Sequence, residues 1–418
     1  MTTTATSIPG PAPATDALAC AARSVAEKAA LRLALAGGGT GGHLVPGLHV
    51  LAAARARGNA PLADLVWFTS GRAVEERVLA RLPELAQPAH AARGADDVRV
   101  ERVALVLEPE GGGAPSRSAL VLRTPRAVSV ARRALVAHQS EVLLALGGFT
   151  GLPAVLAARS LGIPVALLEV NAHAGAATRW LSRFAQRVFH AWPATHAASH
   201  GAAHVWTGAP LAPEFTKGPL PAEVSERARA ELGFDPALPL VVVLGGSQGA
   251  AGLNAFVRAH TPALLAARVQ VLHQVGPGRM AEAAHAATGY RTQGYVAVEY
   301  VDPAWRAIAA ATVVLCRGGA STLAEVAALR RPALVVPYPH HKDQHQEKNA
   351  RELGDGVRIV REAELGVATR DALIALASPS GAAERARCSA ALARAVPVDA
   401  AERIFDELCA LARTRRER

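Results

Sequence analysis

The sequence is poor in cysteine and in aromatic residues. Of its 418 residues only four are cysteines, no two of them form a C-x-x-C pair, and aromatics make up 4%. This spacing favours neither a disulfide framework nor a zinc knuckle. No run of about 18 uncharged apolar residues occurs, and no basic segment precedes an apolar one, so we expect neither a membrane span nor a signal peptide. A cytoplasmic protein is the default expectation.

Several motifs of nucleotide and metal binding are also missing. No Gly-Lys-Ser/Thr follows a glycine-rich turn, which excludes a P-loop. No carboxylate ends the apolar run 65–70, where a second strand of a dinucleotide-binding fold would carry one, and this disfavours NAD. His341 and His345 have i, i+4 spacing, but H-E-x-x-H and D-x-D are absent. We therefore expect no metal ion and no cofactor.

Hydrophobic residues make up half of the chain and charged residues 19%. This composition predicts a globular protein, and the length suggests two or three domains. Lys and Arg number 45 against 35 Asp and Glu, a net charge of +10. A basic surface fits an anionic partner, such as a nucleotide or a membrane, although it also serves solubility alone.

One pattern occurs twice, about half a chain apart. Residues 31–36 form a short apolar run that leads into Gly37-Gly38-Gly39-Thr40-Gly41-Gly42-His43, and residues 238–244 lead into Gly245-Gly246-Ser247-Gln248-Gly249. Each pattern predicts a buried strand, a tight turn and a helix. Helical stretches alternate with further apolar runs, which indicates parallel sheets covered by helices on both faces. These further strands are expected at 65–69, 142–146, 165–169, 188–190, 269–274, 313–316 and 333–336.

We therefore predict an α/β fold of two doubly wound, Rossmann-like domains that face each other across a cleft. Ligands of such sheets bind beyond the carboxyl ends of the strands, and hence in the cleft. Asp399 is the expected N-cap of a last helix that packs back towards the N-terminal domain. The predicted segments are an extension at 1–30 (disordered over 1–16), an N-terminal domain at 31–208, a Pro- and Gly-rich linker at 209–222, a C-terminal domain at 223–395, and the last helix with a basic tail at 396–418.

Both glycine-rich turns can bind an anion, because unobstructed backbone N–H groups at a helix start attract negative charge. Tight strand–helix packing is the alternative. His43 lies where the first turn becomes a helix, so it could accept a proton near neutral pH, or it could cap or pack.

A third strand–turn–helix element runs from Cys316 to Glu325. Glu325 could accept hydrogen bonds from ribose hydroxyls, or it could cap the helix, since it has capping-box spacing from Thr322. The polar stretch 336–349 follows the next strand and could bind sugar hydroxyls, with a solvated loop as the alternative.

Residues 118–136 predict a helix that begins at Thr124-Pro125, with Thr124 as N-cap. Apolar residues mixed with arginines suit the interface of an anionic bilayer, although an ordinary amphipathic surface helix has the same pattern. The membrane-docking candidates are Leu122, Arg123, Arg126, Val130 and Arg133.

Four ordered blocks within about residues 31–360 resemble the MurG family of UDP-N-acetylglucosamine:lipid I N-acetylglucosaminyltransferases. The blocks are Gly38–His43 with Pro46-Gly47-Leu48, Leu161–Pro164 through Glu169 and Asn171, Gly245–Ala250 with Asn254, and Arg317–Glu325 followed by His345-Gln346 and Asn349-Ala350. The resemblance implies the GT-B glycosyltransferase architecture and a UDP-sugar donor on the C-terminal domain. It implies inverting transfer of N-acetylglucosamine (GlcNAc) to the C4 hydroxyl of N-acetylmuramic acid (MurNAc) in lipid I, which yields lipid II and UDP.

The resemblance also assigns roles to individual residues. His43 is the implied catalytic residue, which would take the proton of the acceptor hydroxyl or else support the developing negative charge. Glu169, Asn171 and Gly148 lie on the acceptor side. The implied donor contacts are Thr40, Gly41, Gly42, Ser247, Gln248, Gly249, Val301, Arg317, Ala320, Thr322, Glu325, His345 and Gln346. Thr40 would also face the acceptor, and Arg317 would stabilise the leaving diphosphate.

The resemblance further implies a peripheral protein at the cytoplasmic face of the inner membrane. Its implied partners are an anionic phospholipid surface and proteins of cell-wall synthesis and division, with no nucleic acid. The family's Glu-Gln-Asn block, however, reads Glu169-Val170-Asn171 here, and its G-x-P-V-R motif ends in Leu211-Ala212. A related GT-B enzyme with another nucleotide sugar and a soluble acceptor, or a non-catalytic nucleotide-sugar-binding protein, therefore stays open.

Overall fold

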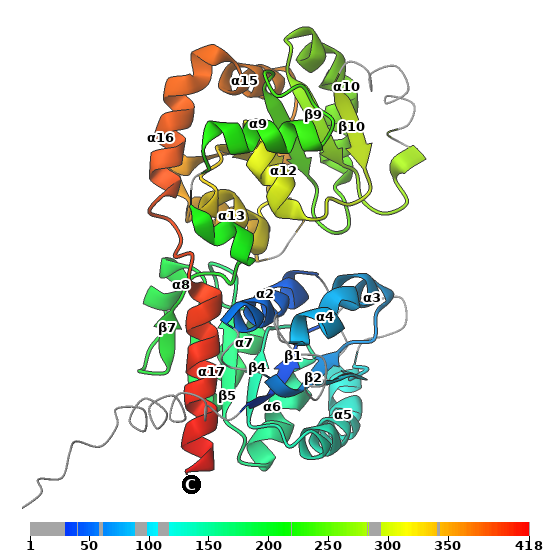
Figure 1. Ribbon diagram of the computed structural model, residues 1–418. Coiled ribbons are helices and arrows are strands. Elements are labelled where there is room, and N and C mark those ends of the chain that lie inside the picture. The colour runs from blue at the N-terminus through cyan, green and yellow to red at the C-terminus, as the bar shows by residue number, and fades with distance from the viewer. Residues whose placement is uncertain are drawn as a thin grey trace, which may run out of the picture.

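The computed structural model describes residues 30–39, 41–57, 62–87, 98–107, 117–218, 220–281, 283, 294–340 and 343–417, with only the backbone at 57, 117–121, 216 and 217. The described chain forms two lobes, one for each half of the sequence (Figure 1). Thr40, His341 and residues 1–29 of the expected N-terminal extension lie outside the described residues.

A parallel sheet forms the centre of the N-terminal lobe. Its strands are β1 (Leu31–Ala36), β2 (Leu62–Thr69), β3 (Arg99–Ala104), β4 (Val142–Ala145), β5 (Val165–Glu169), β6 (Arg187–His190) and β7 (His204–Trp206). They lie in the order β3-β2-β1-β4-β5-β6-β7, and every pair is parallel. The order reverses between β1 and β4, which is where sheets of this kind bind ligands.

The C-terminal lobe repeats this plan. Its strands are β8 (Leu240–Leu244), β9 (Gln270–Gln274), β10 (Tyr295–Val298), β11 (Val313–Cys316), β12 (Ala333–Val335) and β13 (Val357–Ile359). They lie in the order β10-β9-β8-β11-β12-β13, again all parallel. Each apolar run that was expected to form a strand forms one, and the prediction of two Rossmann-like domains is confirmed.

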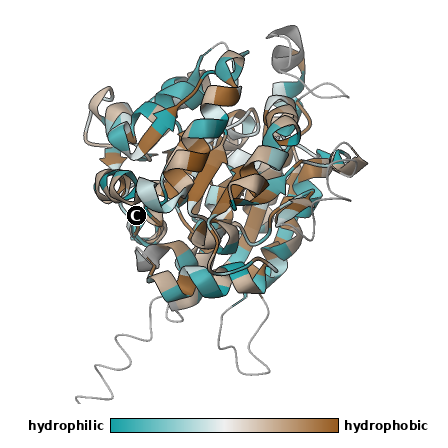
Figure 2. Ribbon diagram, turned by 90° about the horizontal axis from the view of Figure 1, so that it is seen from above, coloured by the Kyte–Doolittle hydropathy of each residue, from teal (hydrophilic) through white to brown (hydrophobic). Residues whose placement is uncertain are grey.

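Helices surround both sheets. In the N-terminal lobe they are α2 (Gly41–Arg57), α3 (Ala73–Val78), α4 (Leu82–Ala86), α5 (Arg117–Ala137), α6 (Gly151–Ser160), α7 (Ala176–Leu181) and α8 (Pro193–Ala197). The C-terminal lobe has α9 (Ala222–Glu231), α10 (Ala251–Ala266), α12 (Ala304–Ala310), α13 (Ala320–Ala328), α14 (His345–Arg351), α15 (Val367–Ala377) and α16 (Ala382–Leu392), and α17 (Ala400–Arg416) ends the chain. Seen from above, apolar strands lie at the centre of the helices (Figure 2).

Alternate residues of the central strands enter different cores, because successive side chains of a strand point to opposite faces. In β1, Leu33 and Leu35 belong to one apolar cluster and Ala34 and Ala36 to another. Strand β8 divides its residues between two clusters in the same way. Both faces of each sheet are therefore buried, as parallel sheets require.

The chain crosses between the lobes twice, and the two crossings touch. The first crossing contains Gly208 and the second contains Pro397. A Cβ atom on Gly208 would lie 2.9 Å from the carbonyl oxygen of Pro397. After this point α17 lies along the N-terminal lobe (Figure 1). Phe405 and Leu408 join the cluster that contains Leu44 of α2.

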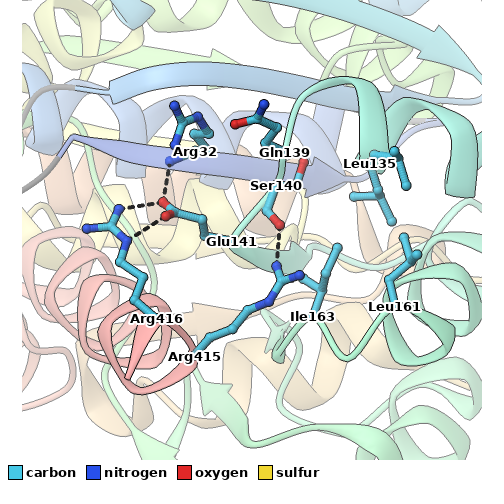
Figure 3. A pocket seen from close by; sticks show the side chains of 10 residues that line it. Arg32, Leu135, Gln139, Ser140, Glu141, Leu161, Ile163, Arg415 and Arg416 are labelled. Carbon is cyan, nitrogen blue, oxygen red and sulfur yellow. Dashed lines mark hydrogen bonds and ion pairs between the residues drawn. The ribbon is translucent and has the colours of Figure 1, made fainter. Parts of the chain in front are cut away.

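The basic tail fastens α17 to the far end of the N-terminal sheet. Arg416 donates to both carboxylate oxygens of Glu141, and Arg415 donates to the backbone carbonyl of Ser140 (Figure 3). These residues line a cavity of about 420 Å³. Asp399 occupies the N-cap position of α17 as expected, although its side chain makes no capping hydrogen bond.

The helix that was expected to begin at Thr124 begins at Arg117 instead, and Pro125 lies inside it. Proline removes one helical hydrogen bond. Helix α5 nevertheless continues, because its side chains Ala127, Ala131 and Leu135 are buried at helical spacing against the sheet. Among the described residues, no helix is long and apolar enough to cross a membrane.

Candidate active site in the cleft between the domains

The two glycine-rich turns face each other across the lobes. The first follows β1 and begins α2, and the second follows β8 and leads to α10. A Cβ atom on Gly41 would lie 3.8 Å from Cβ of Ser247 and 3.9 Å from its Oγ. The structure therefore brings together Gly41 and Gly42 on one side with Ser247, Gln248 and Gly249 on the other. Helix starts carry unpaired N–H groups, so the space between these turns favours an anion.

The second turn needs glycine where backbones approach closely. Gly249 has φ +71°, and a Cβ atom there would lie 2.3 Å from the carbonyl oxygen of Val275. No other residue type fits that position without moving the neighbouring strand end.

His43 has a defined orientation in the first turn of α2. Its Nδ1 lies 3.1 Å from the carbonyl oxygen of Gly38. A carbonyl only accepts, so Nδ1 carries the hydrogen, and Nε2 of the neutral ring keeps its lone pair. Gly147 and Gly148 pack against the ring: a Cβ atom on Gly147 would lie 2.9 Å from Cδ2 of His43. The orientation of His43 therefore leaves Nε2 able to accept a proton, and Gly148 lies beside the ring.

A buried carboxylate that sequence reasoning missed holds the first turn. Glu75 of α3 is 2% exposed, and its Oε1 accepts hydrogen bonds from Gly39 N (2.6 Å), Ser70 N (3.1 Å) and Ser70 Oγ (2.5 Å). Its Oε2 accepts from the backbone of Gly71 and Arg72. Nothing in the local sequence around Glu75 forms a motif that could have found it.

Glu325 does not cap its helix, so that alternative is wrong. Helix α13 begins at Ala320 with Gly319 as N-cap, and no side chain makes a capping hydrogen bond there. Glu325 is buried instead, and burial raises its pKa to about 8. A carboxyl group whose pKa is shifted this far is typical of a ligand-binding or catalytic site.

Other predicted donor residues surround α13. Ala320 is buried in the apolar cluster of the N-terminal lobe, so the start of α13 lies against that lobe. Thr322 is half-buried in the first turn of α13. Val301 packs partly buried against the C-terminal core. Burial, followed by the charges of Asp302 and Glu325, raises the pKa of neighbouring Tyr300, so this segment lies near Glu325.

Gln346 is fixed at the start of α14. Its Oε1 accepts hydrogen bonds from Gly318 N (3.2 Å) and Tyr338 N (2.9 Å). The carbonyl end of the amide is thereby used, and Nε2 is the end that can donate to a ligand. The ring of His345 lies across from His173 of the N-terminal lobe, with centroids 6.3 Å apart.

The contacts of Arg317 lie within the C-terminal lobe. It donates to the carbonyl oxygens of Val336 (3.0 Å) and Pro337 (3.3 Å), and it forms an ion pair with Glu362. Its guanidinium is 5.7 Å from the ring centroid of Tyr338. These contacts favour a structural role over the expected one at the leaving diphosphate.

Glu169 likewise shapes a loop. Its Oε1 accepts from Asn171 N (3.0 Å) and Nδ2 (3.2 Å), and its Oε2 accepts from Gly175 N (2.9 Å) and Thr178 Oγ1 (2.6 Å). This buried carboxylate positions Asn171 at the carboxyl end of β5. Asn349 of α14, which lies in a block of the family resemblance but received no role from it, contacts the same loop.

Most of the membrane-docking candidates are exposed on α5. Leu122 is 78% exposed, and Arg123, Arg126 and Arg133 are exposed too. Val130 differs, because it is half-buried against the core of the lobe. In the described part of the chain, no group of three or more His, Cys, Asp or Glu side chains is placed to hold a metal ion.

Comparison with known proteins defines the class. The glycosyltransferase family 28 N-terminal domain matches residues 33–190, and the family 28 C-terminal domain matches residues 240–393. With two facing Rossmann-like domains and paired glycine-rich turns, the protein is a family 28 glycosyltransferase of GT-B architecture.

Curated relatives narrow the assignment. Proteins named UDP-N-acetylglucosamine–N-acetylmuramyl-(pentapeptide) pyrophosphoryl-undecaprenol N-acetylglucosamine transferase are similar over most of the chain. The one from Sorangium cellulosum is 36% identical over 92% of this chain and 89% of its own. The one from Acidothermus cellulolyticus is 38% identical over 90% of this chain and 96% of its own. The chain belongs to the MurG family of N-acetylglucosaminyltransferases.

Solved structures agree on the fold. Acinetobacter baumannii MurG has a TM-score of 0.62 at 22% identity, over 90% of this chain and 98% of that chain. A UDP-GlcNAc 2-epimerase from Neisseria meningitidis, bound to UDP-GlcNAc, has a TM-score of 0.58 at 13% identity, over 90% of this chain and 99% of its own. At these identities the likeness shows the fold alone, and the fold serves more than one chemistry.

Proposed function

We propose that this protein transfers GlcNAc from UDP-GlcNAc to the C4 hydroxyl of MurNAc in lipid I, and releases lipid II and UDP. The observation that carries the proposal is the approach of Gly41 to Ser247. It puts a proton acceptor, His43, on one side of the cleft and an anion-binding turn on the other. Membership of the MurG family supports the choice of donor and acceptor.

The reaction is an inverting displacement. Nε2 of His43 takes the proton of the acceptor hydroxyl, and its oxygen attacks the anomeric carbon from the face opposite the UDP. The bond to UDP breaks, and the bonding electrons leave with the diphosphate. General-base help of this kind is worth about 10²–10⁴-fold in rate. The contacts of His43 with Gly38 and Gly148 support this role, because they fix the ring in an orientation that leaves Nε2 able to accept a proton.

The donor lies on the C-terminal lobe. N–H groups of the Ser247–Gly249 turn stabilise the diphosphate as negative charge develops on it, with no metal required. Glu325 meets the ribose, and Nε2 of Gln346 donates to a sugar hydroxyl. His345, Val301 and the start of α13, at Ala320 and Thr322, complete the donor site.

The protein works as a peripheral protein at the cytoplasmic face of the inner membrane. Exposed Leu122 inserts among lipid tails while Arg126 and Arg133 meet anionic headgroups. Proteins of cell-wall synthesis and division would meet it at that surface. Co-sedimentation with phosphatidylglycerol vesicles tests this: we expect binding that weakens in phosphatidylcholine, at high salt and in Leu122→Ser. Equal binding to neutral and anionic vesicles would contradict it.

A transfer assay tests the activity. The purified protein is incubated with UDP-GlcNAc and a lipid I analogue, and UDP and the lipid-linked disaccharide are both measured. We expect one UDP for each disaccharide, with a rate unchanged by EDTA. Product with a soluble acceptor alone would favour a related glycosyltransferase, and UDP-GlcNAc binding without turnover would favour a sensor. Loss of activity in EDTA with recovery on adding Mg²⁺ would contradict metal independence.

A further inference from the structure

A histidine of α2 binds the first crossing between the lobes. His49 lies six residues after His43 and about 9 Å further along the same helix. Its Nδ1 is 2.9 Å from the carbonyl oxygen of Pro210. A carbonyl oxygen only accepts, so Nδ1 carries the hydrogen and donates it. A side chain of the N-terminal lobe is therefore bonded to the backbone that leads to the C-terminal lobe.

His49 is held neutral in this contact near neutral pH. The ring is half-buried and Pro210 is buried. Burial lowers the pKa of His49, against the opposing effects of the hydrogen bond to Pro210 and the charge of Glu214. A neutral imidazole has one N–H group, and His49 uses it on Pro210. Loss of this donor would leave a buried carbonyl oxygen without a partner, which is costly.

The histidine end of the bond is rigid towards the N-terminal lobe. Helix α2 packs on its own sheet through Leu44, Val50 and Leu51, which are buried in one apolar cluster. Residues of α17 belong to the same cluster. His49 therefore moves together with the lobe that holds His43.

The Pro210 end is attached to the other lobe. Leu211 and Phe215 are each 2% exposed and belong to an apolar cluster formed mainly by the C-terminal lobe. Gly208, two positions before Pro210, donates its backbone N–H to the carbonyl oxygen of His190 in the N-terminal lobe, at 3.2 Å. The chain thus leaves one lobe at Gly208 and enters the core of the other at Leu211, with Pro210 between these two anchored points.

The second crossing passes the same place. Gly208 has φ +88°, and the carbonyl oxygen of Pro397 lies 2.9 Å from the position of a Cβ atom on it. Both crossings therefore meet within two residues of Pro210. Hinge motions concentrate their change of backbone dihedral angles in a few residues of a connection. A rotation of the lobes has to occur close to the His49 contact, and the hydrogen bond restricts it.

We propose that His49 is a positioning residue that holds the first crossing against α2 and so fixes the direction in which the C-terminal lobe closes on His43. The inference rests on the proposed transferase activity, in which the donor lies on one lobe and the proton acceptor on the other. Loss of the bond should impair the alignment of the reacting atoms more than donor binding, because a misplacement of about 1 Å costs up to about 10²-fold in rate.

Three variants of His49 separate the hydrogen bond from the bulk of the ring. His49→Leu removes the donor, His49→Asn places an amide N–H near the position of Nδ1, and His49→Gln places one near the position of Nε2. With a lipid I analogue we expect kcat to fall about 5–50-fold in His49→Leu and His49→Gln, and to stay within about threefold of the wild type in His49→Asn. The UDP-GlcNAc Kd from calorimetry should change less than about threefold in all three variants.

His260 supplies the matched control. It is a half-buried histidine of α10 in the C-terminal lobe, and its ring centroid lies 4.9 Å from that of Phe256. His260→Leu makes the same change of size and polarity as His49→Leu without touching the crossing. It should keep kcat within about twofold of the wild type. An equal fall in the two leucine variants would count against a role of the bond to Pro210.

Hydrogen exchange supplies a readout that does not depend on turnover. Without ligands, the backbone amides of Gly208 and Leu211 should exchange faster in His49→Leu than in the wild type, because the crossing has lost a contact that holds it. They should exchange at the wild-type rate in His49→Asn. If His49→Leu does not fold, His49→Gln takes its place, since it also lacks a donor at the position of Nδ1.

Three results would overturn the inference. One is a His49→Leu variant with wild-type kcat and exchange. Another is a His49→Asn variant as impaired as His49→Leu, because the ring and not its N–H group would then matter. The third is a loss of UDP-GlcNAc affinity as large as the loss of kcat. Absence of transfer by the wild type would instead overturn the proposed function, and the exchange comparison would still decide whether His49 holds the crossing.

Discussion

Gly41 and Ser247 lie 206 positions apart in the sequence, yet a Cβ atom on Gly41 would be 3.8 Å from Cβ of Ser247. Each belongs to the turn after a central strand of its own sheet, β1 or β8. Two separate sheets thus present their carboxyl ends to the same space. A ligand bound there contacts both lobes at once, so closing the lobes and binding the ligand are coupled.

A side chain at Gly41 should block this space. Gly41→Val directs two methyl groups towards Ser247, so we expect UDP-GlcNAc affinity to fall at least about tenfold, which corresponds to about 1.4 kcal/mol. Gly41 does not have a positive φ, so Tm should change little. Gly41→Ala is the control, because its Cβ makes only an ordinary contact with Ser247. Calorimetry that shows equal affinity for wild type and Gly41→Val would show that the donor lies elsewhere.

His43→Ala should abolish most turnover and leave donor binding intact. We expect kcat to fall about 10²–10⁴-fold, since the acceptor hydroxyl loses its proton acceptor. UDP-GlcNAc affinity should stay within a small factor. Gly147→Ala is the companion variant: its Cβ would lie 2.9 Å from the imidazole and should lower kcat by tilting the ring. Wild-type turnover in His43→Ala would remove the residue from the chemistry.

Glu325 should make stability depend on pH. Its pKa is about 8 in the folded protein against an ordinary value of 4.5. Between these values the folded state keeps a proton that the unfolded state releases, so folding becomes less favourable as pH rises, and above about pH 8 the loss is complete. Glu325→Gln removes this pH-dependent loss of stability, because glutamine has no proton to release. Urea unfolding should therefore show the variant gaining stability over the wild type from pH 5 to pH 8, and a difference that does not vary with pH would refute the assignment.

Two adjacent glycines should respond differently to the same change. A Cβ on Gly318 would lie 2.2 Å from a backbone oxygen of Gln346, whereas on Gly319 the nearest atom is 3.9 Å away. We expect Gly318→Ala to destabilise the protein by about 1–3 kcal/mol through overpacking and to weaken donor binding. Gly319→Ala should keep the stability of the wild type. Equal Tm values for the two variants would show that α14 can move away from the turn.

The sequence predicted the interior of both sheets and missed their edges. The four strands that were not expected, β3, β7, β10 and β13, are the outermost strands of the two sheets. Inner strands are covered on both faces and read as continuous apolar runs. Edge strands are partly exposed, as in Arg99–Ala104, where three charged residues interrupt the apolar ones. Their pairing depends on a neighbour that is distant in sequence, so local composition could not reveal it.

Within the site, sequence motifs located the glycine-rich turns but not the side chains that hold the site in place. The glycine-rich turns were found because their pattern occurs twice along the chain, and His43 was found because it lies where the first turn becomes a helix. Glu75 and Asn349 act through single side chains whose partners lie 36 and 177 positions away. A lone Glu carries no local pattern, and the family block that contains Asn349 does not say what its side chain contacts. Only the three-dimensional structure could show the partners of these two residues.

The structure of the complex with UDP-GlcNAc tests the central claim most directly. We predict the diphosphate between the turn at Gly41–Gly42 and the turn at Ser247–Gly249, the ribose at Glu325 and the sugar beside Gln346. The anomeric carbon should face the side of the cleft that holds His43. A diphosphate bound outside the space between these turns, or a sugar directed away from His43, would contradict the account.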